Sequence, residues 1–128
     1  MAKTRVLLVD DEKDFLDVGI ERINSWGYEV RAVRSGPEAI DIAKNKGADI
    51  IVLDYIMPDM DGVFALKQIR EIDPKIPVIM FTAFPDERSI EGTEKLGVSV
   101  FIPKLSAYAD PWSALRTALD IVEKNLKV

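Results

Sequence analysis

Aspartate, threonine and lysine stand just beyond four of the five short apolar runs in this sequence. These residues are Asp10, Asp11, Asp54, Thr82 and Lys104. Gathered in one pocket, the carboxylates would bring about three negative charges and the lysine would offset only one, so a proton or a cation must supply the difference. Hard oxygen ligands without nitrogen or sulfur favour Mg²⁺, with Mn²⁺ as the alternative. The residue types therefore predict a divalent-metal site.

The same residues could also carry phosphoryl chemistry. A carboxylate can attack phosphorus and form an acyl phosphate, but it is repelled by the anionic phosphoryl group. A metal ion, a lysine ammonium and a hydroxyl, each on a different phosphoryl oxygen, would neutralise the transition state. Asp54, the metal, Lys104 and Thr82 supply that set, and the small side chain of Ala83 leaves space for the incoming group.

The composition excludes several other classes of function. The chain has 128 residues, of which 48% are hydrophobic and 30% charged, so we expect one globular domain spanning residues 1–128. Its net charge of −5 argues against nucleic-acid binding as the main activity. Cysteine and histidine are both absent, which removes disulfides, thiolate chemistry, imidazole zinc sites and histidine-based triads.

The distribution of apolar residues gives no sign of a membrane protein. No apolar run approaches the roughly 18–20 residues that a membrane span needs. The first five residues lead straight into a short apolar run rather than into the core of a signal peptide. We therefore expect a cytoplasmic protein.

Five apolar runs alternate with helical patterns along the chain. The runs are residues 6–9, 28–33, 50–53, 78–81 and 98–102. Four are almost continuously apolar, as in strands covered on both faces, whereas residues 28–33 alternate like a half-exposed edge strand. Such alternation of strands and helices predicts an α/β fold in which helices cover both faces of a parallel sheet. Ligands of open parallel sheets bind at the carboxyl ends of the strands, where the candidate residues lie.

Helix boundaries are marked by capping residues. Helical periodicity covers residues 12–26, and Ser35, followed by proline and glutamate, reads as a capping box for a helix ending at Gly47. A third helix is expected over residues 61–72, and Asp110 followed by proline opens the last one. Between them, Asp86 would cap a helix with Gly92 in its middle, and that glycine predicts the least stable element.

The motifs around these residues resemble those of response regulator receiver domains of two-component signalling. The matching segments are residues 9–12, residues 54–62 with their Met-Pro and Asp-Gly pairs, residues 81–83, and Phe101 and Lys104. The resemblance covers nearly the whole chain. It implies the flavodoxin-like doubly wound (βα)5 fold of the chemotaxis regulator, with a five-stranded sheet of order 2-1-3-4-5.

The resemblance also implies a role for each site residue. Asp54 would be the phosphoacceptor, receiving its phosphoryl group from the phosphohistidine of a sensor histidine kinase or a phosphotransfer protein. Asp11 and Asp54 would ligate Mg²⁺ directly, Asp10 through water, and Ile56 through its backbone carbonyl. Thr82, Ala83 and Lys104 would stabilise the phosphoryl group. Thr82 and Phe101 would then form a switch.

The switch would act on a surface made of the fourth helix, the fifth strand and the fifth helix. That surface would control an output domain or protein, and it could also form a homodimer. The chain would act as a regulatory phosphoacceptor that catalyses only its own phosphorylation and dephosphorylation, with no direct contact to nucleic acid or membrane.

Three positions depart from the pattern of the family. Leu105 replaces the usual proline after the lysine, so we expect a trans peptide bond, because a cis non-proline bond costs about 2.5–4 kcal/mol. The last helix begins about three residues late, which would place Tyr108 and Trp112 near the output surface. Ile56 and Phe84 are apolar where the family tunes dephosphorylation, which predicts a long-lived acyl phosphate because neither residue can orient an attacking water.

Two other classes of function remain alternatives. A Mg²⁺-dependent phosphatase of the haloacid dehalogenase type also uses an aspartate after a strand, but it needs a second aspartate two residues later, where this chain has Ile56. A degenerate receiver would serve only in dimerisation or docking, and the complete set of site residues argues against it.

Overall fold

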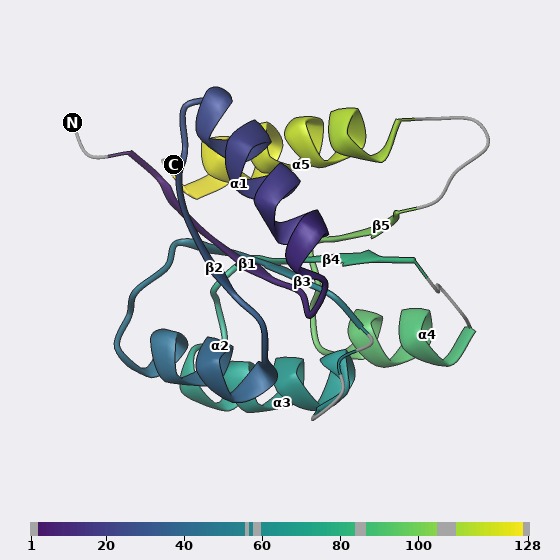
Figure 1. Cartoon of the computed structure of the whole chain (residues 1–128). Coiled ribbons are helices and arrows are strands. Elements are labelled where there is room, and N and C mark those ends of the chain that lie inside the picture. The colour runs from purple at the N-terminus through teal and green to yellow at the C-terminus, as the bar shows by residue number, and fades with distance from the viewer. Residues whose placement is uncertain (1–2, 56, 58–59, 84–86, 105–109, 127–128) are drawn as a thin grey trace.

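Five parallel strands form one sheet that runs through the middle of the molecule (Figure 1). The structure is a computed structural model that describes residues 3–55, 57, 60–83, 87–104 and 110–126. The strands are β1 (Arg5–Val9), β2 (Glu29–Val33), β3 (Ile50–Leu53), β4 (Val78–Thr82) and β5 (Val100–Pro103). Their order is β2-β1-β3-β4-β5, which confirms the expected topology.

Helices cover both faces of the sheet. On one face lie α1 (Lys13–Ser25) and α5 (Pro111–Leu126), and on the other lie α2 (Gly36–Lys44), α3 (Gly62–Ile72) and α4 (Glu87–Lys95) (Figure 1). Each helix connects two parallel strands or follows the last one, as a doubly wound α/β fold requires. Within the part of the chain that the structure describes, no helix is long and apolar enough to cross a membrane.

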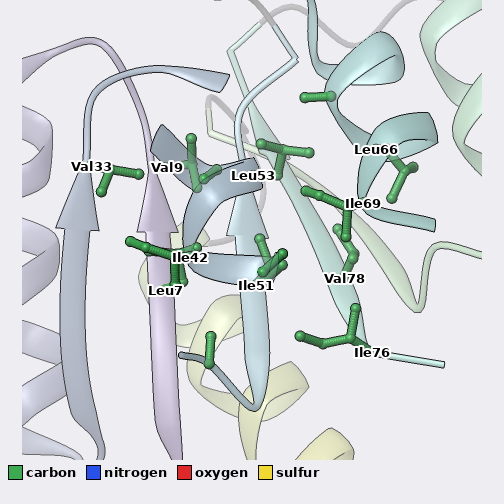
Figure 2. Close-up of a cluster of buried hydrophobic side chains, with 14 of the residues drawn as sticks. Leu7, Val9, Val33, Ile42, Ile51, Leu53, Leu66, Ile69, Ile76 and Val78 are labelled. Carbon is green, nitrogen blue, oxygen red and sulfur yellow. The ribbon is translucent and has the colours of Figure 1, made fainter. Parts of the chain in front are cut away.

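The alternation of side chains along the strands divides the core into two layers. Leu7, Val9, Ile51 and Leu53 point toward α2 and α3 (Figure 2), while their neighbours Val6 and Leu8 pack in the layer beneath α1 and α5. Because successive strand residues face opposite sides, a continuous apolar run fills both layers at once. This explains why β1, β3 and β4 read as uninterrupted apolar segments.

The two edge strands differ from these central strands. β2 is half-exposed, as its alternating sequence predicted, with Glu29 and Arg31 facing solvent. The expectation that the fifth run is covered on both faces was wrong for β5, where Val100 and Phe101 are only partly buried and Pro103 is exposed. The reason is topological, since the strand order places β5 at the other edge of the sheet.

The boundaries of α2 confirm one expectation and correct another. The Ser35 hydroxyl accepts a hydrogen bond of 3.3 Å from the backbone N–H of Glu38, as the capping box predicted. The helix ends at Lys44 rather than running to Gly47, and the left-handed conformation is taken by Lys46, with φ of +53°. Gly47 instead allows a close approach, because a Cβ there would lie 2.9 Å from the Ile42 side chain.

The glycine in α4 has a packing role that the sequence did not reveal. A Cβ on Gly92 would lie 3.3 Å from the side chain of Val63, so the glycine lets α4 lie close against α3. The proposed helix cap, Asp86, lies outside the described residues.

Candidate functional site

Asp10 and Asp54 lie side by side because they extend two neighbouring strands. Val9 of β1 is in register with Leu53 of β3, so the next residue of each strand is one of the two aspartates. Both aspartates continue the sheet hydrogen bonding: the N–H of Asp54 donates to the carbonyl of Val9 at 3.0 Å, and the N–H of Asp10 donates to the carbonyl of Val33 at 3.2 Å. The two residues are 1% and 5% exposed. The sheet therefore fixes two buried carboxylates at its carboxyl edge.

Thr82 and Lys104 are brought to the same edge by β4 and β5. Thr82 is in register with Pro103, and the backbone N–H of Lys104 donates to the Thr82 carbonyl at 2.7 Å. Thr82 is completely buried and Lys104 is 8% exposed. The Lys104 ammonium donates to Oδ2 of Asp10, and to Oδ2 of Asp54 at 3.3 Å. Lys104 is 94 positions from Asp10 and 50 positions from Asp54 in the chain, yet the three side chains form one buried ionic cluster.

Asp11 completes an acidic group that suits a divalent cation. One carboxylate oxygen from each of Asp10, Asp11 and Asp54 lies within 4.8 Å of the others. The Lys104 ammonium, which pairs with Asp10 and Asp54, contributes one positive charge to this group of three carboxylates. Lys104 alone therefore does not neutralise the group. Because oxygen donors and an excess of negative charge favour a hard divalent ion, the residues fit Mg²⁺. The acidic cluster predicted from the sequence is therefore present.

The environment of Asp54 disfavours its charged form. Burial is the largest cause and raises the pKa of Asp54, while the nearby Lys104 ammonium opposes the change and the Asp10 carboxylate adds to it. A carboxylate that is poorly solvated and repelled by a neighbouring carboxylate is stabilised when a cation binds beside it or when it forms a bond to an electrophile. The surroundings of Asp54 therefore favour a cation or an electrophile beside its carboxylate.

Two polar contacts at the rim of the site were not foreseen from the sequence. Glu12 lies 4.0 Å from the Lys104 ammonium and is mostly exposed, so it adds a weakly held carboxylate. Arg34, directly after β2, donates from Nε and Nη2 to the backbone carbonyl of Asp11 at 3.2 and 2.9 Å. Arg34 thereby holds the loop that carries Asp11. In the sequence, the feature that could have indicated this contact is the position of Arg34 directly after an edge strand.

Trp112, at the start of the last helix, lies differently from what we expected. Trp112 was placed near the surface of the fourth helix, fifth strand and fifth helix, but its ring stacks on Phe15 of α1, with centroids 4.8 Å apart. It also meets Phe81 edge-on at 5.4 Å, so α5 turns this side chain toward α1. Phe101 is partly buried and packs against the core layer of α2 and α3.

Several predicted site residues are not open to comparison with the structure. Ala83 is half-buried directly after Thr82, and its predicted role of leaving space for a phosphoryl group stays a prediction. Ile56, Phe84, Leu105 and Tyr108 lie outside the described residues, so their predicted roles and the geometry of the bond after Lys104 stay predictions.

Comparison with known proteins identifies the family. The model of the response regulator receiver domain family matches residues 6–116. The sporulation initiation phosphotransferase F of Bacillus subtilis is 32% identical over 126 residues, covering 98% of this chain and 96% of that protein. A probable transcriptional regulator, ycf27 of Porphyridium aerugineum, is 32% identical over 97% of this chain but only 51% of its own length. The chain thus spans about half the length of that regulator.

Solved structures show the same architecture. A CheY-like receiver domain protein from Methanospirillum hungatei superposes with a TM-score of 0.87 at 22% identity, over 98% of each chain. In the complex of CheX, CheY, BeF3 and Mg²⁺ from Borrelia burgdorferi, the matched chain has a TM-score of 0.82 at 29% identity, covering 94% of this chain and 90% of that one. The flavodoxin-like fold expected from the sequence is confirmed, and the chain belongs to the response regulator receiver domain family of two-component signalling.

Proposed function

We propose that this protein accepts a phosphoryl group on Asp54 from the phosphohistidine of a sensor kinase or phosphotransfer protein, and that this modification controls an output partner. The observation that carries the proposal is the acidic cluster of Asp10, Asp11 and Asp54, in which the Lys104 ammonium contacts the buried carboxylates of Asp10 and Asp54. Such a cluster is costly unless a cation and an anionic electrophile are meant to enter it.

Asp54 is the nucleophile of this reaction. One of its carboxylate oxygens attacks phosphorus, an O–P bond forms, and the P–N bond to the donor imidazole breaks while that imidazole keeps the bonding electrons and takes up a proton. Burial raises the pKa of Asp54 and leaves its carboxylate poorly solvated. Less hydration therefore has to be removed before the attack.

The other residues of the cluster neutralise the charge of the transferred group. The Lys104 ammonium already contacts Oδ2 of Asp54, so it is placed to bind a phosphoryl oxygen there. The Thr82 hydroxyl, at the end of the neighbouring strand, serves as a second donor, and half-buried Ala83 leaves space beside it. Asp10, Asp11, Asp54 and the carbonyl of Ile56 would hold Mg²⁺ (or Mn²⁺), which when bound neutralises the phosphoryl oxygens and the attacking carboxylate.

The output surface lies on α4, β5 and α5. Between β5 and α5 is a cavity of about 460 Å³ with an apolar lining that includes Val100, Ile102 and Ala118. Ile121, on its border, is 56% exposed. Phe101, on β5, connects this surface to the core, so a change in its packing would alter the surface that a partner or a second copy meets. We propose one cytoplasmic receiver domain across residues 1–128, which acts as a regulator rather than as an enzyme with an external substrate.

The test is incubation with acetyl phosphate and Mg²⁺, followed by mass spectrometry. We expect one added phosphoryl group on the wild type and none on Asp54→Asn, while Asp49→Asn, at the other end of β3, should still be modified. Wild-type protein that gains no phosphoryl group, or an Asp54→Asn variant that gains one, contradicts the proposal.

Two further assays separate the alternatives. Turnover of para-nitrophenyl phosphate would indicate a phosphatase. A melting temperature unmoved by beryllofluoride and Mg²⁺ would indicate a degenerate receiver.

A further inference from the structure

The Lys104 ammonium has an aromatic neighbour as well as carboxylate partners. Its Nζ lies 4.0 Å from the centroid of the Phe15 ring. Phe15 belongs to the first turn of α1, shortly after the aspartates that follow β1. The face of an aromatic ring carries negative electrostatic potential, so a cation above it is attracted within about 6 Å, and most strongly where water is excluded. Lys104 meets that condition, because its side chain is only 6% exposed.

The Phe15 ring is itself held in place from two sides. It stacks on the ring of Trp112 at 4.8 Å with an angle of 24°, and it meets Phe81 at 5.4 Å. Phe81 is a fully buried residue of β4, while Trp112 is in the first turn of α5. Gly19 of α1 lies close to this group, since a Cβ there would lie 2.5 Å from the Leu8 side chain and in van der Waals contact with the indole ring of Trp112, at 3.4 Å. Three elements therefore fix the orientation of the ring beneath the ammonium.

We infer that Phe15 is a positioning residue for phosphoryl transfer, acting through Lys104. The ammonium ends a flexible chain, and its hydrogen bonds to Asp10 and Asp54 are directional. Attraction to the ring face has little directional demand. Lys104 can therefore turn its N–H groups from a carboxylate oxygen to a phosphoryl oxygen on Asp54 while the ring still supports it. This inference rests on the proposed function and adds a residue to it.

The experiment replaces Phe15 by phenylalanines carrying one, two or three fluorine atoms. Fluorination withdraws electron density from the ring face and keeps nearly the same shape, so folding is preserved while the attraction weakens. With phosphoramidate and Mg²⁺ as reagents, the phosphorylation rate should fall stepwise, by about three- to tenfold across the series. Phe15→Leu should fall within the same range, and Phe15→Tyr should stay within about twofold of the wild type because tyrosine keeps the cation-binding face.

Matched controls separate positioning from packing. The same fluorinated series at Phe81 perturbs the aromatic contacts of Phe15, and the series at Phe64 perturbs an aromatic residue of α3 that is 49% exposed. The Phe64 series should leave the rate unchanged, and the Phe81 series should slow it much less than the Phe15 series does, because the ammonium lies over the Phe15 ring. A packing role predicts instead that the Phe81 series slows the reaction as much as the Phe15 series does, and that result overturns the inference.

A measurement on the metal-free protein tests the contact without any reaction. The Lys104 Nζ lies 4.0 Å from the ring centroid, so the ring current should shift the NMR signal of the adjacent Cε methylene protons upfield of the other lysines. In Phe15→Leu this signal should return to the ordinary position. Two results overturn this inference but not the proposed function. One is an ordinary Lys104 signal in the wild type. The other is a phosphorylation rate that does not change across the Phe15 fluorination series although the wild type is phosphorylated. A wild type that takes up no phosphoryl group overturns the proposed function together with it.

Discussion

Replacing Asp54 by asparagine should stabilise the metal-free protein, although it removes a charged hydrogen-bond partner of Lys104. Two unit charges 4.8 Å apart repel each other by about 3.5 kcal/mol at an effective dielectric constant of about 20. Asp54 is repelled in this way by both Asp10 and Asp11. On the same scale, its attraction to Lys104 at 3.3 Å is about 5 kcal/mol. Repulsion therefore exceeds attraction by about 2 kcal/mol, and burial of the carboxylate adds to the cost.

We expect Asp54→Asn to be about 1–2 kcal/mol more stable than the wild type in buffer containing a chelator, with a melting temperature about 3–8 °C higher. Adding Mg²⁺ should narrow the difference, because the ion binds the wild type more tightly. At ten times its dissociation constant, Mg²⁺ would stabilise the wild type by about 1.4 kcal/mol. Thermal and urea unfolding, each with and without Mg²⁺, measure both effects.

Asp49→Asn is the matched control, because Asp49 directly precedes β3 and Asp54 directly follows it. The hydrogen bonds from Arg5 lower the pKa of Asp49, so this carboxylate stabilises the fold at neutral pH and loses its effect as pH falls through its lowered pKa. The side chains of Arg5 and Asp49 are both more than a third exposed, so Asp49→Asn should lower the free energy of unfolding at neutral pH by at most about 1 kcal/mol. An Asp54→Asn variant that melts below the wild type in chelator, or a Mg²⁺ shift equal in both proteins, would refute the reasoning.

Four further variants test other parts of the structure. Gly62→Ala should lower stability by about 1–3 kcal/mol in urea unfolding, because its Cβ would lie 2.6 Å from the backbone oxygen of Asp54 and from the Cα of Tyr55. Arg70→Met should lower the free energy of unfolding by about 2–4 kcal/mol in the same measurement, because the guanidinium donates to four backbone carbonyls around the ends of α3 and α4. Arg70→Lys should recover only part of this stability. Arg34→Ala should weaken Mg²⁺ binding, measured by calorimetry, by up to about tenfold, since it releases the loop that carries Asp11, one of the residues proposed to hold the ion. The double variant Ile56→Asn with Phe84→Glu should shorten the lifetime of the acyl phosphate, which is measured by mass spectrometry as the loss of the phosphoryl group over time. An unchanged or longer lifetime would show that these positions do not limit attack by water.

The sequence by itself determined the class of fold and most of the site. Continuous apolar runs between amphipathic segments can satisfy their burial only in a sheet covered on both faces, so the α/β architecture followed from the pattern. Because polar residues that end parallel strands meet at one edge, Asp10, Asp54, Thr82 and Lys104 could be placed together before any coordinates existed. The strand order itself came from the resemblance to a family, since local periodicity does not specify which strands are neighbours.

Only the tertiary structure decided which distant side chains meet. The stacking of Phe15 on Trp112 and the support of Lys104 by the Phe15 ring depend on the relative placement of α1, α5 and β5. Likewise, the close approach of Gly92 to Val63, where a Cβ would lie 3.3 Å from the valine side chain, depends on the packing of α4 against α3. The physical reason is common to these cases: local sequence sets the periodicity and the ends of an element, whereas side-chain contacts depend on how the elements pack, and residues far apart in the chain fix that packing together.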